Sequence, residues 1–400
     1  MITEHLQKIR QAAMDVLHPS EKDLAHGLEL HRESYVFDAY GFTPTAGGIC
    51  PRCDEAFERG AGRDELNLLR EEFRMNGAFD DPEMVARLKT AWEFSGVDCI
   101  FQNSGFECNN VELMLLRLSN YTNLVDKLPD VYERAVFPQQ LSGIRERGKR
   151  ALYMTTNGVP LPSQLSSTAE ALQYIGVFFR LGVRMMHLTY NRRNLIGDGC
   201  AESADAGLSD FGREVIAEMN RVGVIPDVAH SGQRTSLEAA QVSKKPVVAS
   251  HTTVRHFSTH YRAKCDEVID AVKASGGYVG ICGHPPFLQG SMDLNAMLDH
   301  VEYVARKYGV DHVAIGTDNG LDLDVDKKAL ASRASRPVWE SYWPAPGAGY
   351  ELMTKAQYAS VNCMNWPMYT VGLVQRGFTD EEIRKIIGGN VLRVISETLA

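Results

Sequence analysis

The chain has 400 residues, of which 44% are hydrophobic and 23% charged, and its formal net charge is -9. This composition is typical of a globular protein, and the length suits one large α/β domain with insertions or two domains. Because no basic block breaks the even spread of charge, and no apolar run approaches the roughly 18 residues of a membrane helix, we expect neither a nucleic acid nor a membrane as a partner.

Residues 1–33 open with an amphipathic helix, and from about residue 34 short apolar runs alternate with helical ones. Alternating strands and helices imply parallel strands joined by right-handed crossovers. The eight runs that we predict as strands are YVFDAY (35–40), VDCIFQN (97–103), ALYMTTN (151–157), RMMHLTY (184–190), VIPDVAH (224–230), VVASH (247–251), YVGICG (278–283) and HVAIGTD (312–318). Eight units are the number in a (β/α)₈ TIM barrel.

We therefore predict an N-terminal helical segment, 1–33, followed by one (β/α)₈ barrel domain over 34–400. Two insertions interrupt the barrel, at about 43–90 and about 322–370, and the second contains Trp339, Trp343 and Trp366. Either insertion is interpreted as a lid or a dimer surface, or alternatively as surface loops with local aromatic cores.

The eight cysteines are too sparse for a disulfide scaffold, which favours free thiols in a reducing cytoplasm. The run CPRC at 50–53 has the spacing of a zinc site. Without a second pair of ligands nearby, two free loop cysteines are the favoured interpretation.

Each predicted strand ends on or is followed by a polar side chain. In TIM barrels the catalytic groups lie at these C-terminal ends and on the loops that follow them. The residues at these positions are Tyr40, Asn103, Asn157, Tyr190, His230, His251, His284 and Asp318. Together they predict a pocket at one rim of the barrel.

The segment 207–256, which contains VIPDVAH and VVASHTTVRH, resembles the membrane dipeptidase family, peptidase family M19. The likeness extends to LGVRMMHLTYNRRNLIGDGC (181–200), HVAIGTD (312–318) and IIGGNVLRVISETL (386–399). This family is a metal-dependent branch of the amidohydrolase-like barrels. The resemblance implies that fold, a hydrolase of dipeptides, and a homodimer.

The resemblance also implies roles for four residues. In this family the histidines that correspond to His230 and His251 bind one zinc of a dinuclear pair, and the aspartate that corresponds to Asp318 binds the other and handles a proton. Arg262 matches the arginine that binds the substrate's carboxylate, a role that suits a planar, always charged group. We take His251 and Asp318 as the catalytic candidates.

The sequence departs from the family pattern at the first strand, where Asp-Gly-His-x-Asp is replaced by FDAYGF. Tyr40 takes the place of the ligand histidine and Phe42 that of the ligand aspartate. Phenylalanine cannot bind a metal, and a neutral tyrosine is a poor substitute. The bridging glutamate is likewise replaced, by Thr156 or Asn157.

A pocket histidine after the fourth strand is replaced by Tyr190, whereas His187, three residues earlier, is predicted to be packed in the strand. Tyr40, Asn157 and Tyr190 thus become candidate substrate-binding residues. Glu107 and Cys108, after the second strand, are the nearest candidates to replace the lost ligands.

The remaining ligands decide the metal content that we expect. His230, His251 and Asp318 are three donors, and no carboxylate is left to bridge two ions. Two cations a few ångströms apart require bridging anions, so we expect zero or one Zn²⁺ per chain. Three functions follow: a dipeptidase with at most one metal, a diverged metal-independent enzyme using His251 or His230 as acid–base group, or a binding protein for a small carboxylate on the same barrel.

Overall fold

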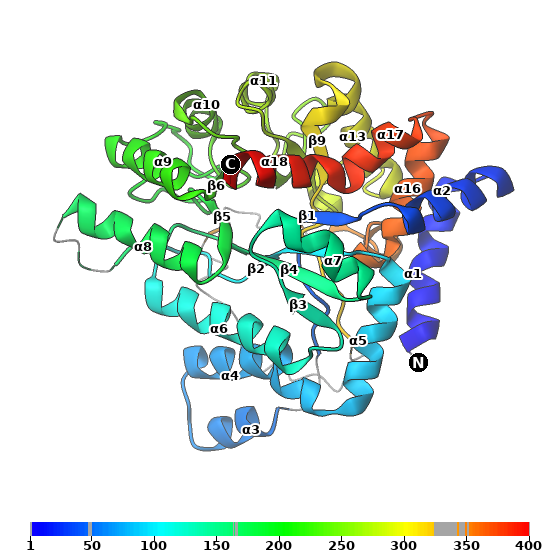
Figure 1. The fold of residues 1–400 in the computed structure, drawn as a ribbon, viewed down its shortest axis with the longest axis horizontal. Helices are drawn as coiled ribbons and strands as arrows, with labels where there is room; N and C mark the ends of the chain where they lie inside the picture. The colour runs from blue at the N-terminus through cyan, green and yellow to red at the C-terminus, as the bar shows by residue number, and fades with distance from the viewer. Residues whose placement is uncertain are drawn as a thin grey trace.

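The computed structural model describes residues 2–46, 50–162, 164, 167–323, 342–343, 349 and 352–399. Over these residues the chain folds as a parallel β-barrel surrounded by helices (Figure 1). The eight barrel strands are β1 (Phe37–Gly41), β2 (Cys99–Asn103), β4 (Arg150–Thr156), β5 (Val183–His187), β6 (Ile225–Asp227), β7 (Ala249–Thr252), β8 (Val279–Ile281) and β9 (Val313–Ile315). All eight predicted strands are present, and the predicted fold class is confirmed.

The strands pair in chain order, in two parallel runs. β1, β2, β4, β5 and β6 form the first run, and β7, β8 and β9 form the second. Backbone hydrogen bonds close both seams: Val228 N donates to Val248 O at 2.8 Å, and Asp318 N donates to Tyr40 O at 2.9 Å. The second of these bonds joins the end of β9 to β1 and completes the barrel.

One strand, β3 (Tyr132–Arg134), was not predicted from the sequence. β3 pairs with the first half of β4, whose second half pairs with β5. Three residues are too few to display the alternation by which a strand is predicted.

Helices cover the outside of the barrel and both of its ends. They are α1 (Ile2–Leu17), α2 (Glu21–Glu33), α3 (Pro51–Glu58), α4 (Arg63–Met75), α5 (Pro82–Ser95), α6 (Val111–Lys127), α7 (Leu141–Glu146), α8 (Thr168–Arg180), α9 (Asp210–Val222), α10 (Gln233–Val242), α11 (Asp266–Ala274), α12 (Pro285–Leu288), α13 (Leu294–Tyr308), α15 (Lys355–Ser360), α16 (Trp366–Gln375), α17 (Asp380–Arg384) and α18 (Asn390–Leu399). None of the helices in the described ranges is both long and apolar enough to cross a bilayer.

The two predicted insertions differ in how far they are described. The range 43–90 contains α3, α4 and the first part of α5, the last helix before β2. In 322–370, Trp343 and Trp366 are described, while Trp339 lies outside the described residues. Leu6 and Ile9 of α1, in the N-terminal segment, belong to the main hydrophobic cluster.

The strand pleat divides the core into an outer and an inner cluster. The inner cluster contains Phe101, Tyr153, Met185 and Ile225, and Val394 of α18 joins it at the N-terminal end of the barrel. Because strand side chains alternate, the next inward positions toward the other end are two residues further along each strand. There the barrel interior becomes polar, with Asn103, Thr155, His187 and Asp227.

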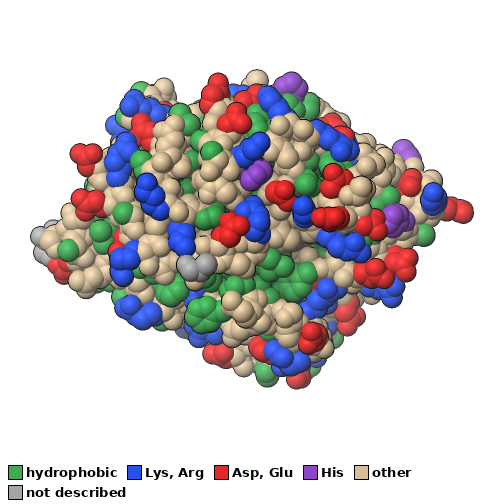
Figure 2. All heavy atoms as spheres, turned by 45° about the horizontal axis from the view of Figure 1, so that its top comes forward, with side chains coloured by type: hydrophobic (Ala, Val, Ile, Leu, Met, Phe, Trp, Pro, Cys, Tyr) green, Lys and Arg blue, Asp and Glu red, His purple; other side chains and the backbone are tan. Residues whose placement is uncertain are grey.

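The outer surface carries charges of both signs. Figure 2 shows Lys and Arg side chains interspersed with Asp and Glu across the visible face. This mixture agrees with the even spread of charge along the sequence.

Candidate functional site

A cavity of about 640 Å³ opens at the C-terminal ends of the strands. Seven of the eight predicted strand-end residues line it: Tyr40, Asn103, Asn157, Tyr190, His230, His284 and Asp318. Arg262 lines it as well, whereas the eighth residue, His251, is fully buried beneath its floor. The rim predicted from the sequence is therefore one pocket in the structure.

Two histidines meet at the floor of this pocket. His230 follows β6 and His251 lies in β7, and their Nε2 atoms are 3.0 Å apart. Both side chains are buried, with 2% and 0% of their surface exposed. Two imidazole nitrogens at this separation are close enough to share one cation.

Each of these histidines uses its other nitrogen for a hydrogen bond. His230 Nδ1 lies 2.7 Å from Asn191 Oδ1, and because an amide oxygen only accepts, His230 must donate from Nδ1. The same oxygen also accepts from the thiol of Cys200 at 3.2 Å. His251 Nδ1 lies 2.7 Å from Ser250 Oγ.

Burial keeps both imidazoles neutral. It lowers the pKa of His230 and of His251 well below the usual value, and the positive charge of the Arg262 guanidinium lowers both pKa values further. A neutral imidazole that donates from Nδ1 carries a lone pair at Nε2. Neutral imidazole is also the form that binds a metal.

Asn191 is held in place by a close approach of the backbone. Its own backbone is in the left-handed region, with φ 55°. Gly199 packs so tightly against it that a Cβ at this position would lie 2.1 Å from the carbonyl carbon of Asn191. Only glycine fits there, so Gly199 helps to aim the amide at His230.

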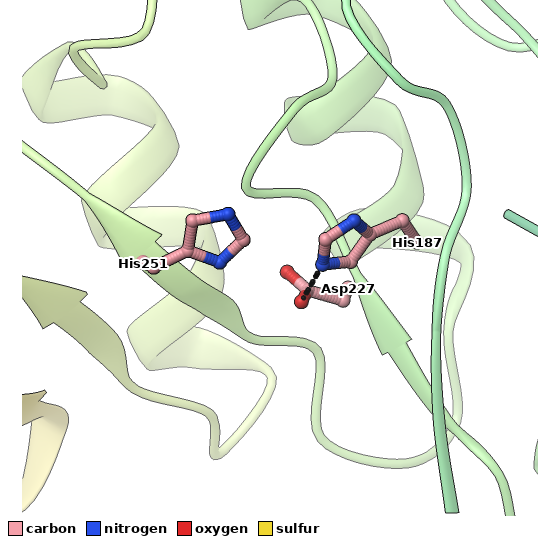
Figure 3. A group of neighbouring side chains, drawn as sticks. All are labelled: His187, Asp227 and His251. Carbon is pink, nitrogen blue, oxygen red and sulfur yellow. Dashed lines mark ion pairs between the residues drawn. The ribbon is translucent and has the colours of Figure 1, made fainter. Parts of the chain in front are cut away.

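Behind His251 lies a second buried group, formed by His187 and Asp227 (Figure 3). His187 Nε2 is 2.7 Å from Asp227 Oδ2, and both side chains are fully buried. Burial by itself would raise the pKa of Asp227, but the contacts with His187, Ser250 and Ala229 N–H hold that pKa below its usual value. Asp227 is therefore ionised.

Asp318 approaches the histidine pair from the end of β9. Its Oδ2 lies 3.9 Å from His251 Nε2 and 2.9 Å from His284 Nε2. The backbone of Asp318 has φ 53°, in the left-handed region that few residues other than glycine adopt. Strain of this kind recurs at functional sites.

Arg262 is buried at the pocket wall with 1% of its surface exposed. It donates from Nη2 to His251 O at 2.7 Å and from Nε to Ala229 O at 3.2 Å. Among the described residues its Nη1 has no hydrogen-bond partner. A buried guanidinium with a spare donor is suited to an anionic group of a ligand.

The substituted family positions form their own contacts. The ring of Tyr40 stacks on His251, with centroids 3.8 Å apart, and its hydroxyl donates to Asn157 Oδ1 at 2.6 Å. Burial raises the pKa of Tyr40 well above its usual value, so it is a neutral phenol. Thr156 is fully buried and donates to Gly158 O, and Asn157 therefore takes the pocket-facing position that the sequence left open between them.

Tyr190 stacks on His230, with centroids 4.0 Å apart. The histidine pair is thus enclosed between two tyrosine rings.

Of the two candidate replacement ligands, Glu107 lines the pocket and Cys108 does not. Glu107 lies 3.9 Å from Arg117, whose guanidinium also pairs with Glu71 at 2.7 Å. Burial raises the pKa of the Cys108 thiol, which disfavours the metal-binding thiolate. Neither residue joins the histidines in a ligand group within the described ranges.

The donors at the pocket floor are two imidazoles and one carboxylate. His230 and His251 supply two neutral nitrogens, and Asp318 is the carboxylate that approaches them. Within the part of the chain that the structure describes, the one group of three His, Cys, Asp or Glu ligand atoms all within 4.8 Å of one another is His187, Asp227 and His251.

Sequence reasoning missed the residues that orient the histidines, namely Asn191, Asp227 and Ser250. Asp227 was detectable, because it lies two positions after Ile225 on the same inward face of β6. Asn191 was not detectable, since its contact with His230 spans 39 residues through a loop.

Comparison with known proteins identifies the family that this chain resembles. The model of the membrane dipeptidase family, peptidase family M19, matches residues 81–329. Dipeptidase tcpJ of Claviceps purpurea is 28% identical over 285 residues, which are 69% of this chain and 58% of that protein. Dipeptidase verJ of Clonostachys rogersoniana is 31% identical over 221 residues, 54% of this chain and 49% of that protein. The chain spans about half the length of these curated relatives.

Solved structures with the same fold cover nearly the whole chain. An amidohydrolase from Pseudomonas aeruginosa is 25% identical with a TM-score of 0.67, covering 93% of this chain and 98% of that one. A metallo peptidase from Rhodobacter sphaeroides, solved with a phosphinate mimic of the dipeptide L-Ala-D-Ala, is 16% identical with a TM-score of 0.64, covering 91% of this chain and 99% of that one. At this identity the second likeness concerns the fold alone.

Proposed function

Because the chain belongs to the membrane dipeptidase family, peptidase family M19, we propose that it is a hydrolase of dipeptides or related small amides that works with at most one metal ion per chain. The family is one of metallopeptidases, and the dipeptidases of Claviceps purpurea and Clonostachys rogersoniana support the same reaction class. The metal that we propose is Zn²⁺, because imidazole nitrogens suit it.

One observation carries this proposal. The Nε2 atoms of His230 and His251 face each other at 3.0 Å, and the hydrogen bonds of His230 with Asn191 and of His251 with Ser250 occupy both Nδ1 atoms. Two converging lone pairs repel each other unless a cation or a proton lies between them. A divalent cation satisfies both nitrogens at once.

A cation held by His230 and His251 would polarise the scissile carbonyl and lower the pKa of a water molecule. Arg262 would bind the substrate's terminal carboxylate through Nη1, which has no hydrogen-bond partner among the described residues, while Nε and Nη2 donate to backbone carbonyls. Asp318 would accept the proton of the attacking water at Oδ2, the oxygen that His284 holds at 2.9 Å.

The same proposal covers the walls of the pocket and the state of the chain. Tyr40, Asn157 and Tyr190 would contact the substrate beside the scissile bond, since all three line the cavity. We also propose a homodimer in the cytoplasm. All eight cysteines are free in the structure, which suits a reducing compartment, and light scattering at micromolar concentration measures the dimer.

The test is hydrolysis of Ala-Ala by the full chain, first stripped with a chelator and then reloaded with one equivalent of Zn²⁺. We expect activity only after reloading, and much weaker activity on the C-terminal amide of the same dipeptide. Arg262→Met should abolish the preference for the free carboxylate. Equal rates with and without metal would refute the proposal and favour the metal-independent enzyme.

A further inference from the structure

Four buried side chains form a continuous chain of contacts beneath the pocket floor. His187 Nε2 lies 2.7 Å from Asp227 Oδ2, the same oxygen accepts from Ser250 Oγ, and Ser250 Oγ lies 2.7 Å from His251 Nδ1. All four side chains have no exposed surface. The chain of contacts ends at the histidine whose Nε2 faces His230.

The direction of each hydrogen bond in this chain is fixed by Asp227. Its Oδ1 accepts from Ala229 N at 2.9 Å and from Ser250 N at 3.1 Å. An ionised carboxylate has no hydrogen to give, so the Ser250 hydroxyl must donate to Oδ2. The Ser250 oxygen is then left as an acceptor, and His251 must donate to it from Nδ1.

The spacing of His187, Asp227 and His251 also meets the distances of a metal site, but hydrogen bonds to Ser250 account for the positions of Asp227 and His251. Both oxygens of Asp227 already accept hydrogen bonds from the backbone or from Ser250. The three side chains do not line the described pocket. A cation at this point would have to displace Ser250 from between Asp227 and His251.

The strand geometry explains why these four groups meet. His187 and Asp227 are register partners on β5 and β6, and their side chains point inward. Gly280 of β8 and Gly316, which follows β9, leave room for Ser250, because a Cβ at either glycine would lie within 2.1 Å of Ser250 O.

We propose that His187, Asp227 and Ser250 are positioning residues, which lock His251 in the tautomer with its proton on Nδ1 and its Nε2 lone pair directed at His230. We call His187, Asp227 and Ser250 the relay. This inference rests on the proposed function, because it holds that the relay sets the affinity of His230 and His251 for a divalent cation. Hydrogen-bonded partners of a metal ligand fix its tautomer and orientation, and their loss weakens metal binding by roughly 10–100-fold.

His187 contributes at the far end of the relay. It faces Asp227 Oδ2, and its ring lies 5.2 Å from that of His251 and 5.3 Å from that of Tyr40. His187 therefore contacts Asp227 and packs against His251, the residue whose tautomer Asp227 sets through Ser250. Its effect on His251 passes through two intervening groups and should be weaker than that of Ser250.

The first experiment measures Co²⁺ binding to the full, metal-stripped chain by the visible absorption of the bound ion, with Zn²⁺ in competition. Ser250→Ala should weaken binding by roughly 10–100-fold, and His187→Phe should weaken it less but in the same direction. The matched controls are Ser95→Ala and His31→Gln, buried residues of the same types that do not contact either ligand histidine. Both controls should lose stability without losing affinity for Co²⁺.

The second experiment needs no metal. Proton–nitrogen correlation spectra of the histidine-labelled apoprotein report which ring nitrogen of His251 carries the proton. The relay requires Nδ1–H in the wild type, and loss of this uniform tautomer in Ser250→Ala.

The outcomes separate the relay from the proposed function. A wild-type His251 protonated on Nε2 overturns the relay even if Ser250→Ala does not fold, and so does a Ser250→Ala affinity within twofold of the wild type. A wild type that binds no Co²⁺ but shows the Nδ1–H tautomer refutes the metal in the proposed function and supports the relay.

Discussion

The histidine pair should hold one divalent cation per chain and exclude a second. Two dications about 4 Å apart, the separation in two-metal sites, repel each other by about 17 kcal/mol at an effective dielectric constant of about 20. One carboxylate at the same distance attracts one dication by about 8 kcal/mol. Asp318 is the carboxylate that approaches the pair, at 3.9 Å from His251 Nε2, and it offsets about half of the repulsion.

The structure also indicates how a second ion could be restored. Tyr40→His, Phe42→Asp and Asn157→Glu together return one nitrogen ligand and two carboxylates to the pocket, and these two carboxylates with Asp318 contribute about 25 kcal/mol against the repulsion of about 17 kcal/mol. Asn157 is chosen over Thr156 because Asn157 lines the pocket.

The assay is elemental analysis after dialysis against excess Zn²⁺ and removal of loosely bound metal. We expect no more than one zinc in the wild type and a rise toward two in the triple variant. A matched control with Phe42→Asn in place of Phe42→Asp adds a polar group without its charge and should bind less. Two zincs in the wild type would refute the charge argument. A triple variant that stays at one or none would mean that the pocket has been reshaped beyond the substituted positions.

Three further predictions concern stability and orientation. Gly199→Ala should lower the unfolding free energy and weaken Co²⁺ binding, because a Cβ would clash with Asn191 at 2.1 Å and displace the amide that orients His230; unchanged affinity would contradict this role. Burial lowers the pKa of His31 to about 4 from 6.5, so the unfolded chain takes up the proton first as pH falls. His31 should therefore cost about 3 kcal/mol of stability as pH drops from above 6.5 toward 4, and denaturation of His31→Gln should show that pH dependence reduced. Tyr40→Phe removes the buried hydrogen bond from the Tyr40 hydroxyl to Asn157 Oδ1. It should lower the unfolding free energy by about 1 kcal/mol, which urea titration measures.

The fold was predictable because its signals are local. Short apolar runs that alternate with amphipathic helices repeat through the chain, and each run became a barrel strand. β3 was missed because three residues carry no period. The pocket was predictable for a related reason, since the C-terminal ends of parallel strands meet at one rim and their polar side chains must converge.

The orientation of the ligands was not predictable. Which atom faces the second nitrogen of His230 or His251 depends on contacts between distant segments, such as that with Asn191, 39 residues away. Whether Thr156 or Asn157 faces the pocket depends on where β4 ends and its alternation stops. Such details depend on a shift of a single residue, and the sequence pattern does not resolve a shift that small.

The altered positions form a mutually satisfied arrangement, which argues against simple decay of a metal site. Tyr40 and Asn157, two positions at which we expect the family to carry metal ligands, hydrogen-bond to each other at 2.6 Å. A buried polar group that loses its partner costs about 1–3 kcal/mol, so a change at one of these positions favours a compensating change at the other. The Tyr40 ring also stacks on His251, with centroids 3.8 Å apart, which ties this pair to the histidines. The pocket thus combines a neutral pair, Tyr40 and Asn157, with His230, Asp318 and Arg262, the groups that we expect to bind one cation and one carboxylate.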